Sequence, residues 1–209
     1  MGRYRARFAS SQSEVLTAQA LRYQCFNLLN RVELDVDDFD TICQHVLIEN
    51  LETNKLICCY RILNFEDGKD ISNSYSAQFY DLKSIESYPK PMIEVGRFCI
   101  DPEVNDPSVI LTAWAALAQI VAQSQTELLF GCSSFEGIDK RKYVDSFALL
   151  RDRYIAPVHW RPRIKSAKVF CYSKDLNCKV DKKKALLNMP PLLKTCLSMG
   201  AWVSDHAVV

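Results

Sequence analysis

Two charged residues within one apolar segment are the strongest candidates for chemistry in this sequence. Glu94 and Arg97 lie in EVGRFCIDPEVNDPSV, residues 94–109, whose first part has the pattern of a buried strand. A charged side chain is costly in a sheet unless it is paired. A carboxylate on a rigid strand can accept the proton of an amine that attacks an activated acyl group, so Glu94 is a candidate general base. Alternatively, Glu94 and Arg97 pair with neighbours at the sheet edge and only support the fold.

The loop that follows this strand is acidic. Residues 101–107 contain Asp101, Glu103 and Asp106 and no glycine. Free amides at a helix start can bind phosphate, but these acids are expected to repel a diphosphate. Asp106 is expected to cap the next helix, and Pro107 suits its first turn. The segment is therefore not typical of a nucleotide site.

The elements that would position Glu94 alternate between strands and helices. A helix is predicted for residues 12–29, and the apolar runs 43–50 and 55–65 predict an antiparallel hairpin. The segment 107–124 has no charged residue and is apolar or small almost all round, so this helix is predicted to lie deep on the sheet. The remaining predicted elements are strands at 3–9, 92–100 and 127–133 and a helix at 140–154. This order predicts an α/β or α+β fold.

Composition excludes several functional classes. The 26 basic and 25 acidic side chains nearly cancel, so no global field predicts a nucleic-acid partner. The nine cysteines form no C-x-x-C pair and the three histidines lie far apart, which predicts reduced thiols in a cytoplasmic protein and no metal site. No signal peptide and no run of 18 consecutive apolar residues is found, so no membrane-spanning segment is expected.

Six segments resemble a known enzyme family and occur in the same order. They are ALRYQCF (20–26), DDFD (37–40), CYRIL (59–63), EVGRFCIDP (94–102), LLFGCSSFEG (128–137) and PPLLKTCLSMGAWVSDHAVV (190–209). They resemble the bacterial ornithine N-acyltransferases that make lyso-ornithine lipid, which are related to the acyl-homoserine lactone synthases. The resemblance implies one GNAT-like acyltransferase domain over residues 1–209, with a central mixed, mostly antiparallel sheet flanked by helices. Family members usually continue past WVSDHAVV, so the last strand of the domain is expected to be missing.

The same resemblance implies an activity. Such enzymes transfer a 3-hydroxy fatty acyl group from acyl carrier protein to the α-amine of ornithine, the first step of ornithine lipid synthesis. The acyl carrier protein is the acyl donor, and no cofactor is implied. A carrier protein presents one phosphodiester on its pantetheine arm instead of the diphosphate of coenzyme A, which agrees with the acidic loop.

Site residues follow by matching the pattern shared with the lactone synthases. Glu94 is the implied catalytic base, and the implied substrate-binding residues are Arg22, Phe26, Asp37, Asp40, Arg61 and Arg97. The acids would hold the cationic ends of ornithine or fix Arg22 in place, and the arginines would meet the ornithine carboxylate or oxygens of the donor. Backbone amides near 97–99 would hold the oxyanion. Alternatively, these side chains form a structural salt-bridge network.

Two further regions are expected to contact substrates or partners. His206 lies in the family-like tail and is expected near the acceptor, although a lone histidine is more often a hydrogen-bonded structural residue. Arg161, Arg163 and Lys165 belong to a basic run, residues 160–168, that would dock an acidic carrier protein or contact the anionic inner membrane peripherally. The alternative is a solvated face.

Two other functions stay open. The first is a lactone synthase-like enzyme, but the segment 27–36 lacks the tryptophan typical of that group. The second is a noncatalytic acyl-carrier-binding protein on the same fold, because fold alone does not fix function.

Overall fold

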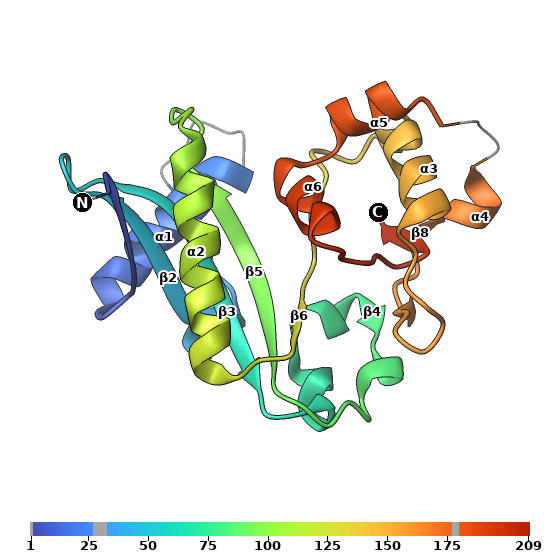
Figure 1. Cartoon of the computed structure of the whole chain (residues 1–209), viewed down its shortest axis with the longest axis horizontal. Helices are drawn as coiled ribbons and strands as arrows, with labels where there is room; N and C mark the ends of the chain where they lie inside the picture. The colour runs from blue at the N-terminus through green and yellow to red at the C-terminus, as the bar shows by residue number, and fades with distance from the viewer. Residues whose placement is uncertain (1, 27–32, 177–179) are drawn as a thin grey trace. The chain divides into compact units, whose positions relative to one another are not determined.

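A computed structural model describes residues 2–26, 33–176 and 180–209 of the chain (Figure 1). The chain divides into two compact units. Unit 1 comprises Met1–Asp67 and Pro89–Gly131, and unit 2 comprises Gly68–Tyr88 and Cys132–Val209. Each unit packs around its own cluster of buried apolar side chains. The single domain expected over residues 1–209 stays a prediction.

Unit 1 is built on a five-stranded sheet. Its strands, in spatial order, are β1 (Tyr4–Phe8), β2 (Gln44–Asn50), β3 (Leu56–Phe65), β5 (Met92–Ile100) and β6 (Leu128–Phe130). The first four pair antiparallel, whereas β6 pairs parallel to β5. The sequence prediction of a central mixed, mostly antiparallel sheet is therefore confirmed, and so is the β2–β3 hairpin.

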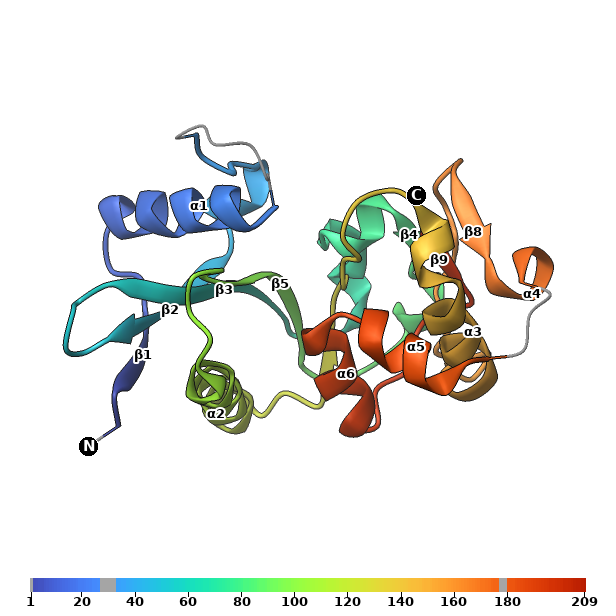
Figure 2. The same ribbon diagram turned by 90° about the horizontal axis from the view of Figure 1, so that it is seen from above.

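Two helices cover opposite faces of this sheet (Figure 2). They are α1 (Gln12–Phe26) and α2 (Pro107–Ser124). Helix α1 packs on a cluster that includes Ala18, Leu21 and Leu47, and the last residues of its predicted span, 27–29, lie outside the described residues. As predicted, the Asp106 side chain caps α2 by accepting a hydrogen bond from the backbone N–H of Ser108.

Helix α2 is not buried on all sides, and this part of the prediction is wrong. Val109, Ala113 and Leu117 follow at spacings of four residues and form the buried face on the sheet. Leu111, on another face, is 66% exposed. The reason is geometric, because one sheet covers only one side of a helix. Helix α2 is also the one described helix long and apolar enough to cross a membrane by length and composition.

Unit 2 combines short helices with two small two-stranded sheets. Its helices are α3 (Val144–Arg153), α4 (Tyr172–Asp175), α5 (Lys182–Asn188) and α6 (Pro191–Ser198). Strand β4 (Tyr80–Asp81) pairs with β7 (Arg163–Ile164), and β8 (Val169–Cys171) pairs with β9 (His206–Val208). Aromatic rings around Phe147 fill the core, with Phe135, Phe170 and Tyr172 at 4.9–5.4 Å between ring centroids. Short 3-10 helices complete the unit at Gly68–Asn73, Ser76–Gln78, Lys83–Ile85 and Lys140–Tyr143.

Candidate functional site

Glu94 lies where strands β5 and β6 part. It is 4% exposed and faces Leu63 on β3 and Phe130 on β6. The pairing of β5 with β6 ends at this residue, although β5 continues to Ile100. Gly131, directly after β6, lets the backbone approach β5 closely at Val95, because a Cβ at residue 131 would lie 2.2 Å from the carbonyl oxygen of Val95. Glu94 is therefore a buried carboxylate at the point beyond which β6 no longer pairs with β5 in unit 1.

A β-bulge follows Glu94 on the same strand. The β3–β5 register shifts from Arg61 opposite Gly96 to Cys59 opposite Cys99, so two residues of β5 face Tyr60 alone. One of them, Arg97, has a φ of 51°, which is uncommon for a residue other than glycine. Such a conformation costs about 1–3 kcal/mol and persists where the surroundings hold it. The bulge therefore changes the direction of the β5 backbone at Arg97, three residues after Glu94.

Ion pairs hold the Arg97 side chain in place. Its Nε lies 3.0 Å from Asp35 Oδ2, and its Nη2 lies 3.1 Å from Asp37 Oδ2. On another side, the guanidinium lies 5.7 Å from the ring centroid of Phe26, which is exposed at the end of α1. The structure thus brings Phe26 and Arg97 together, as the sequence pattern implied.

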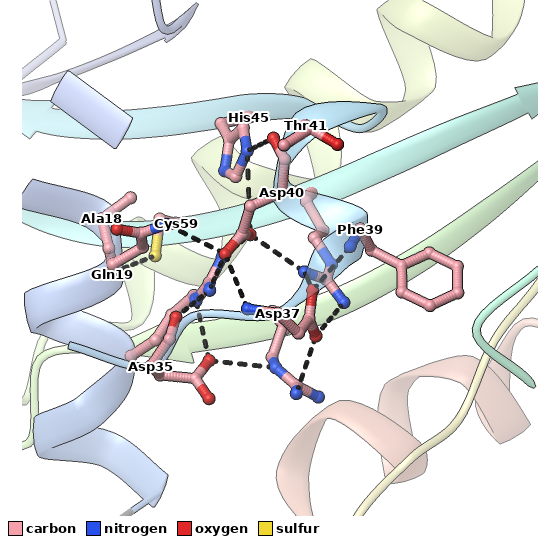
Figure 3. A network of polar contacts seen from close by, with 12 residues as sticks. Ala18, Gln19, Asp35, Asp37, Phe39, Asp40, Thr41, His45 and Cys59 are labelled. Atoms are coloured by element: carbon pink, nitrogen blue, oxygen red, sulfur yellow. Dashed lines mark hydrogen bonds and ion pairs between the residues drawn. The ribbon is translucent and has the colours of Figure 1, made fainter. Parts of the chain in front are cut away.

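The acidic segment before β2 supplies the partners of three arginines (Figure 3). Arg22 Nη1 lies 2.6 Å from Asp40 Oδ1, and Arg22 Nε lies 2.9 Å from Asp35 Oδ2. Arg61 Nη1 lies 2.5 Å from Asp37 Oδ1 and 2.9 Å from Asp40 Oδ1. With Arg97, three guanidinium groups meet three carboxylates, so the formal charges cancel. We refer to Arg22, Asp35, Asp37, Asp40, Arg61 and Arg97 as the arginine–aspartate network.

Local hydrogen bonds explain why the acids of this network point inward. Asp37 caps the 3-10 helix Asp38–Thr41 by accepting from the backbone N–H of Phe39, and Asp40 accepts from the backbone N–H of Asp37. Gln19 on α1 also donates to Asp40 Oδ2, at 2.9 Å. The capping box therefore orients both aspartates independently of their arginine partners.

The network shifts the pKa values of its acids downward. Burial alone would raise the pKa of Asp40, but hydrogen bonds from Arg22 and the charge of Arg22 hold the pKa well below its usual range. Burial also opposes ionisation of Asp37, yet Arg61 and Arg97 lower the pKa of Asp37. Both carboxylates are ionised at neutral pH, as the paired geometry requires.

The members of the network differ in access to solvent. The side chains of Arg22 and Asp40 are 1% and 5% exposed, which suits a supporting role. The side chains of Arg97 and Asp37 are 21% and 23% exposed. Asp35, with 18% of its side chain exposed, is the third member of the network that is partly open to solvent.

Glu94 shares a sheet face with this network. Side chains alternate along a strand, so Cys59, Arg61 and Leu63 of β3 point to one face, and Glu94 opposite Leu63 points with them. Cys59 packs under α1, which identifies this face as the α1 side. The general-base candidate and the arginines thus face the same side of the sheet.

Sequence reasoning missed Cys43, which lies beside these charges. Burial and the nearby carboxylates, Glu94 among them, raise the pKa of the Cys43 thiol to about 11. The thiol is therefore protonated at neutral pH and is a poor nucleophile. Cys43, Asp40 and His45 line part of a cavity of about 370 Å³. Only its position directly before β2 could have indicated this residue.

The acids of the loop after β5 have structural partners. Asp101 is buried and lies 2.8 Å from Lys55 Nζ. Asp106 caps α2 and also accepts a hydrogen bond from the Tyr4 hydroxyl at 2.8 Å. The first amides of α2 thus already face a carboxylate, which disfavours a bound diphosphate.

The remaining predicted site residues belong to unit 2. His206 is fully buried on β9, its Nδ1 lies 2.8 Å from Asp205 Oδ1, and its ring lies 5.1 Å from that of Tyr80. Within the described part of the chain its Nε2 has no hydrogen-bond partner. These contacts are those of a structural histidine, and its predicted place beside the acceptor stays a prediction.

Two of the three predicted docking residues make contacts inside unit 2. Arg161 donates to the carbonyl oxygen of Ala156 at 2.9 and 3.0 Å, and Lys165 donates to that of Ala77 at 2.5 Å. Arg163 lies exposed on β7. Of the three, Arg163 is the one best placed for a partner.

Among residues 2–26, 33–176 and 180–209, no group of three or more His, Cys, Asp or Glu side chains could hold a metal ion.

This chain is similar to known acyltransferases in sequence. Residues 21–115 match the model of the acetyltransferase (GNAT) domain, and this span includes the network, Glu94 and the bulge. The L-ornithine N(alpha)-acyltransferase of Rhodobacter capsulatus is 28% identical over 222 residues, which cover 99% of this chain and 84% of the relative. The enzyme of the same name from Brucella abortus is 29% identical, covering 100% of this chain and 80% of the relative. Among solved structures, the AHL synthase LasI aligns with a TM-score of 0.44 and 19% identity, covering 61% of this chain and 71% of that one.

Proposed function

We propose that this chain acylates the α-amine of ornithine, because residues 21–115 match the acetyltransferase (GNAT) domain and almost the whole chain is similar to L-ornithine N(alpha)-acyltransferases. The donor in this proposal is a 3-hydroxy fatty acyl thioester of acyl carrier protein. The observation that carries the proposal is the placement of Glu94, a buried carboxylate beside a bulge, at the point where two paired strands part.

The proposed reaction uses Glu94 as the base. The α-amine of ornithine attacks the thioester carbon, a C–N bond forms, and the amine loses a proton to the Glu94 carboxylate directly or through a water. The tetrahedral oxyanion accepts hydrogen bonds from backbone amides near the bulge, residues 97–99. Collapse breaks the C–S bond, and the departing thiolate takes up a proton.

The network supplies the charges that the acceptor requires. Ornithine carries a carboxylate and a cationic side chain, and Arg97 and Asp37 are partly exposed charges of the matching signs. Arg22 and Asp40 lie deeper and fix these two in position. In this proposal Arg97 meets the carboxylate, Asp37 meets the side-chain ammonium, and the buried pair is a support.

Thiol release from the donor tests the proposal. Purified protein incubated with 3-hydroxyacyl carrier protein should liberate free carrier thiol only when ornithine is present, and mass spectrometry should identify the Nα-acyl product. Release without ornithine, or no release at any ornithine concentration, would contradict the proposed activity. The second result would favour a noncatalytic carrier-binding protein.

The donor preference is a separate prediction. We expect kcat/KM for an acyl carrier protein thioester to exceed that for the coenzyme A thioester of the same acyl group at least about tenfold, because the acidic loop repels a diphosphate. Initial rates with both donors at matched chain length measure this ratio. Equal efficiency with the two donors would rule out the electrostatic argument.

Docking of the carrier protein gives another prediction. Arg163→Glu is expected to raise KM for the carrier protein about three- to tenfold and to weaken its salt dependence, with kcat unchanged, because carrier proteins are acidic. Lys174→Glu, which reverses an exposed charge on α4 of the same unit, serves as the matched control. A fall in kcat alone, or equal effects of the two substitutions, would show that β7 is not a docking surface.

A further inference from the structure

Three thiols meet under helix α1, on the face of the sheet that carries the arginine–aspartate network. Cys59 on β3 and Cys99 on β5 are register partners and belong to the buried cluster beneath α1. Cys25, in the last turn of α1, packs against the same cluster. The neighbouring Cys58 points to the opposite face, where it packs with the buried residues of α2. We refer to Cys25, Cys59 and Cys99 as the thiol cluster.

Hydrogen bonds bring two members of the thiol cluster together. The Cys99 thiol donates to the sulfur of Cys25 and thereby lowers the pKa of the Cys25 thiol. The Cys25 Sγ also lies 3.3 Å from the carbonyl oxygen of Ile100, the residue after Cys99. Hydrogen bonds with Cys25 and Cys59, together with burial, raise the pKa of the Cys99 thiol far above its usual range. The pair thus combines a thiol that ionises more readily with a neighbour that keeps its proton.

Access to solvent distinguishes the two thiols of this pair. Cys25 is partly exposed, whereas Cys59 and Cys99 are buried. A small oxidant therefore reaches Cys25 first, and Cys99 is placed to attack the oxidised sulfur. Redox-sensing cysteines combine an accessible thiol of lowered pKa with a resolving thiol beside it.

We propose that Cys25 and Cys99 form a redox modification site, which a peroxide converts into a disulfide between α1 and β5. In the first step the Cys25 thiolate attacks hydrogen peroxide, the O–O bond breaks and hydroxide leaves, which gives a sulfenic acid on Cys25. In the second step the Cys99 sulfur attacks this sulfur, the S–O bond breaks, and the thiol proton leaves with the oxygen as water. The two thiols together lose two electrons, and the peroxide is reduced to water.

The disulfide changes the geometry of the candidate site, and this consequence rests on the proposed acyltransfer. An S–S bond of about 2.05 Å is shorter than a hydrogen bond between two thiols, so its formation pulls the end of α1 toward β5. Phe26 follows Cys25 on α1, and Arg97 lies two residues before Cys99 on the bulge. The guanidinium of Arg97 lies 5.7 Å from the ring centroid of Phe26. Oxidation is therefore expected to displace Arg97, which meets the ornithine carboxylate in the proposed reaction.

Peptide mapping of the oxidised protein tests the modification site. The full chain is treated with hydrogen peroxide, the remaining thiols are blocked, and the protein is cleaved after basic and acidic residues. This cleavage leaves Cys25 and Cys99 on separate peptides that contain no other cysteine. Mass spectrometry should show these two peptides linked, and dithiothreitol should separate them. Any other state of Cys25 after the treatment, whether a free thiol, a sulfinic acid or a link to a different cysteine, would overturn the proposal.

Acyltransfer assays test the effect on the candidate site. After removal of the peroxide, kcat/KM for ornithine should be about tenfold lower than in the reduced protein and should recover with dithiothreitol. The same treatment should change kcat/KM of Cys25→Ser by less than about twofold, because serine cannot form the disulfide. Cys196→Ser, which removes a partly buried thiol on α6 of unit 2, is the matched control and should keep the full response.

The two experiments separate this inference from the proposed function. An unchanged kcat/KM in the disulfide-linked protein, or an equal loss in Cys25→Ser, would overturn the proposed effect on catalysis. Because the peptide map needs neither ornithine nor turnover, a Cys25–Cys99 link in a protein that does not acylate ornithine would support the modification site and contradict only the proposed function.

Discussion

Glu94→Gln is expected to lower turnover on the order of 10²-fold or more while the protein stays folded. Glutamine keeps the size and much of the hydrogen bonding of the buried side chain but cannot accept the proton of the attacking amine. The measurement is kcat with saturating donor and ornithine, together with circular dichroism and thermal unfolding of the variant.

The pH profile separates a base from a structural carboxylate. A working base gives a rate that rises with pH along one limb, and this limb should vanish in Glu94→Gln. Glu49→Gln is the matched control, because Glu49 is also a strand glutamate of unit 1 with arginine partners, on β2. It should keep turnover within about twofold. If Glu94→Gln unfolds the protein, or keeps a near-normal rate with an unaltered profile, Glu94 is a structural ion-pair partner.

Arg22→Met is expected to destabilise unit 1 by about 3–5 kcal/mol, because the three carboxylates of the network then face only two guanidinium groups and one negative charge stays uncompensated. Arg22 is almost fully buried between Asp35 and Asp40, so methionine replaces the alkyl part but none of the four polar contacts. Urea unfolding followed by circular dichroism measures the change in the free energy of unfolding.

A surface arginine provides the comparison for this experiment. Arg5 on β1 pairs with Glu49 at 3.0 Å and is more than half exposed, so Arg5→Met should cost less than about 1 kcal/mol. Comparable losses in the two variants would show that the buried network is no more stabilising than a surface pair.

The same network predicts the direction of acid destabilisation. The pKa values of Asp37 and Asp40 are lowered in the folded state, so the folded protein binds fewer protons than the unfolded chain on these groups. Their contribution is fully present above the unfolded aspartate pKa of about 3.9 and is lost as the pH falls below it. Arg22→Met should reduce this dependence, since Asp40 then loses the partner that lowers its pKa. An unchanged acid limb in the variant would contradict that assignment.

Local signals in the sequence determined most of unit 1. The capped start of α2 at Asp106 and Pro107 and the β2–β3 hairpin could be read correctly because each depends on residues close together in the chain. Five of the six residues that form the network could also be collected in advance, since their segments resemble those of a known family, whereas Asp35 was missed. Sequence reasoning left open whether they bind substrate or one another.

Only the tertiary structure decided how these charges are paired. Arg61 reaches Asp37 and Asp40 across more than 20 residues, and Arg97 reaches Asp35 across 62. Such pairs depend on strand register, which is set by packing over the whole sheet and not by neighbours in the chain. The left-handed Arg97 has the same origin, because no local sequence preference places arginine there.

The sequence alone also could not predict that His206 is buried or that one face of α2 is exposed. The sequence of the family-like tail does not show how deep its histidine lies, and only the structure shows His206 fully buried beside Asp205 and Tyr80. The charge-free pattern of α2 suits a helix buried on all sides as well as one with a single buried face, and Leu111 is exposed because the sheet contacts only the other face. The sequence determined which residues carry charge and apolar surface, and long-range packing determined which of them stay accessible.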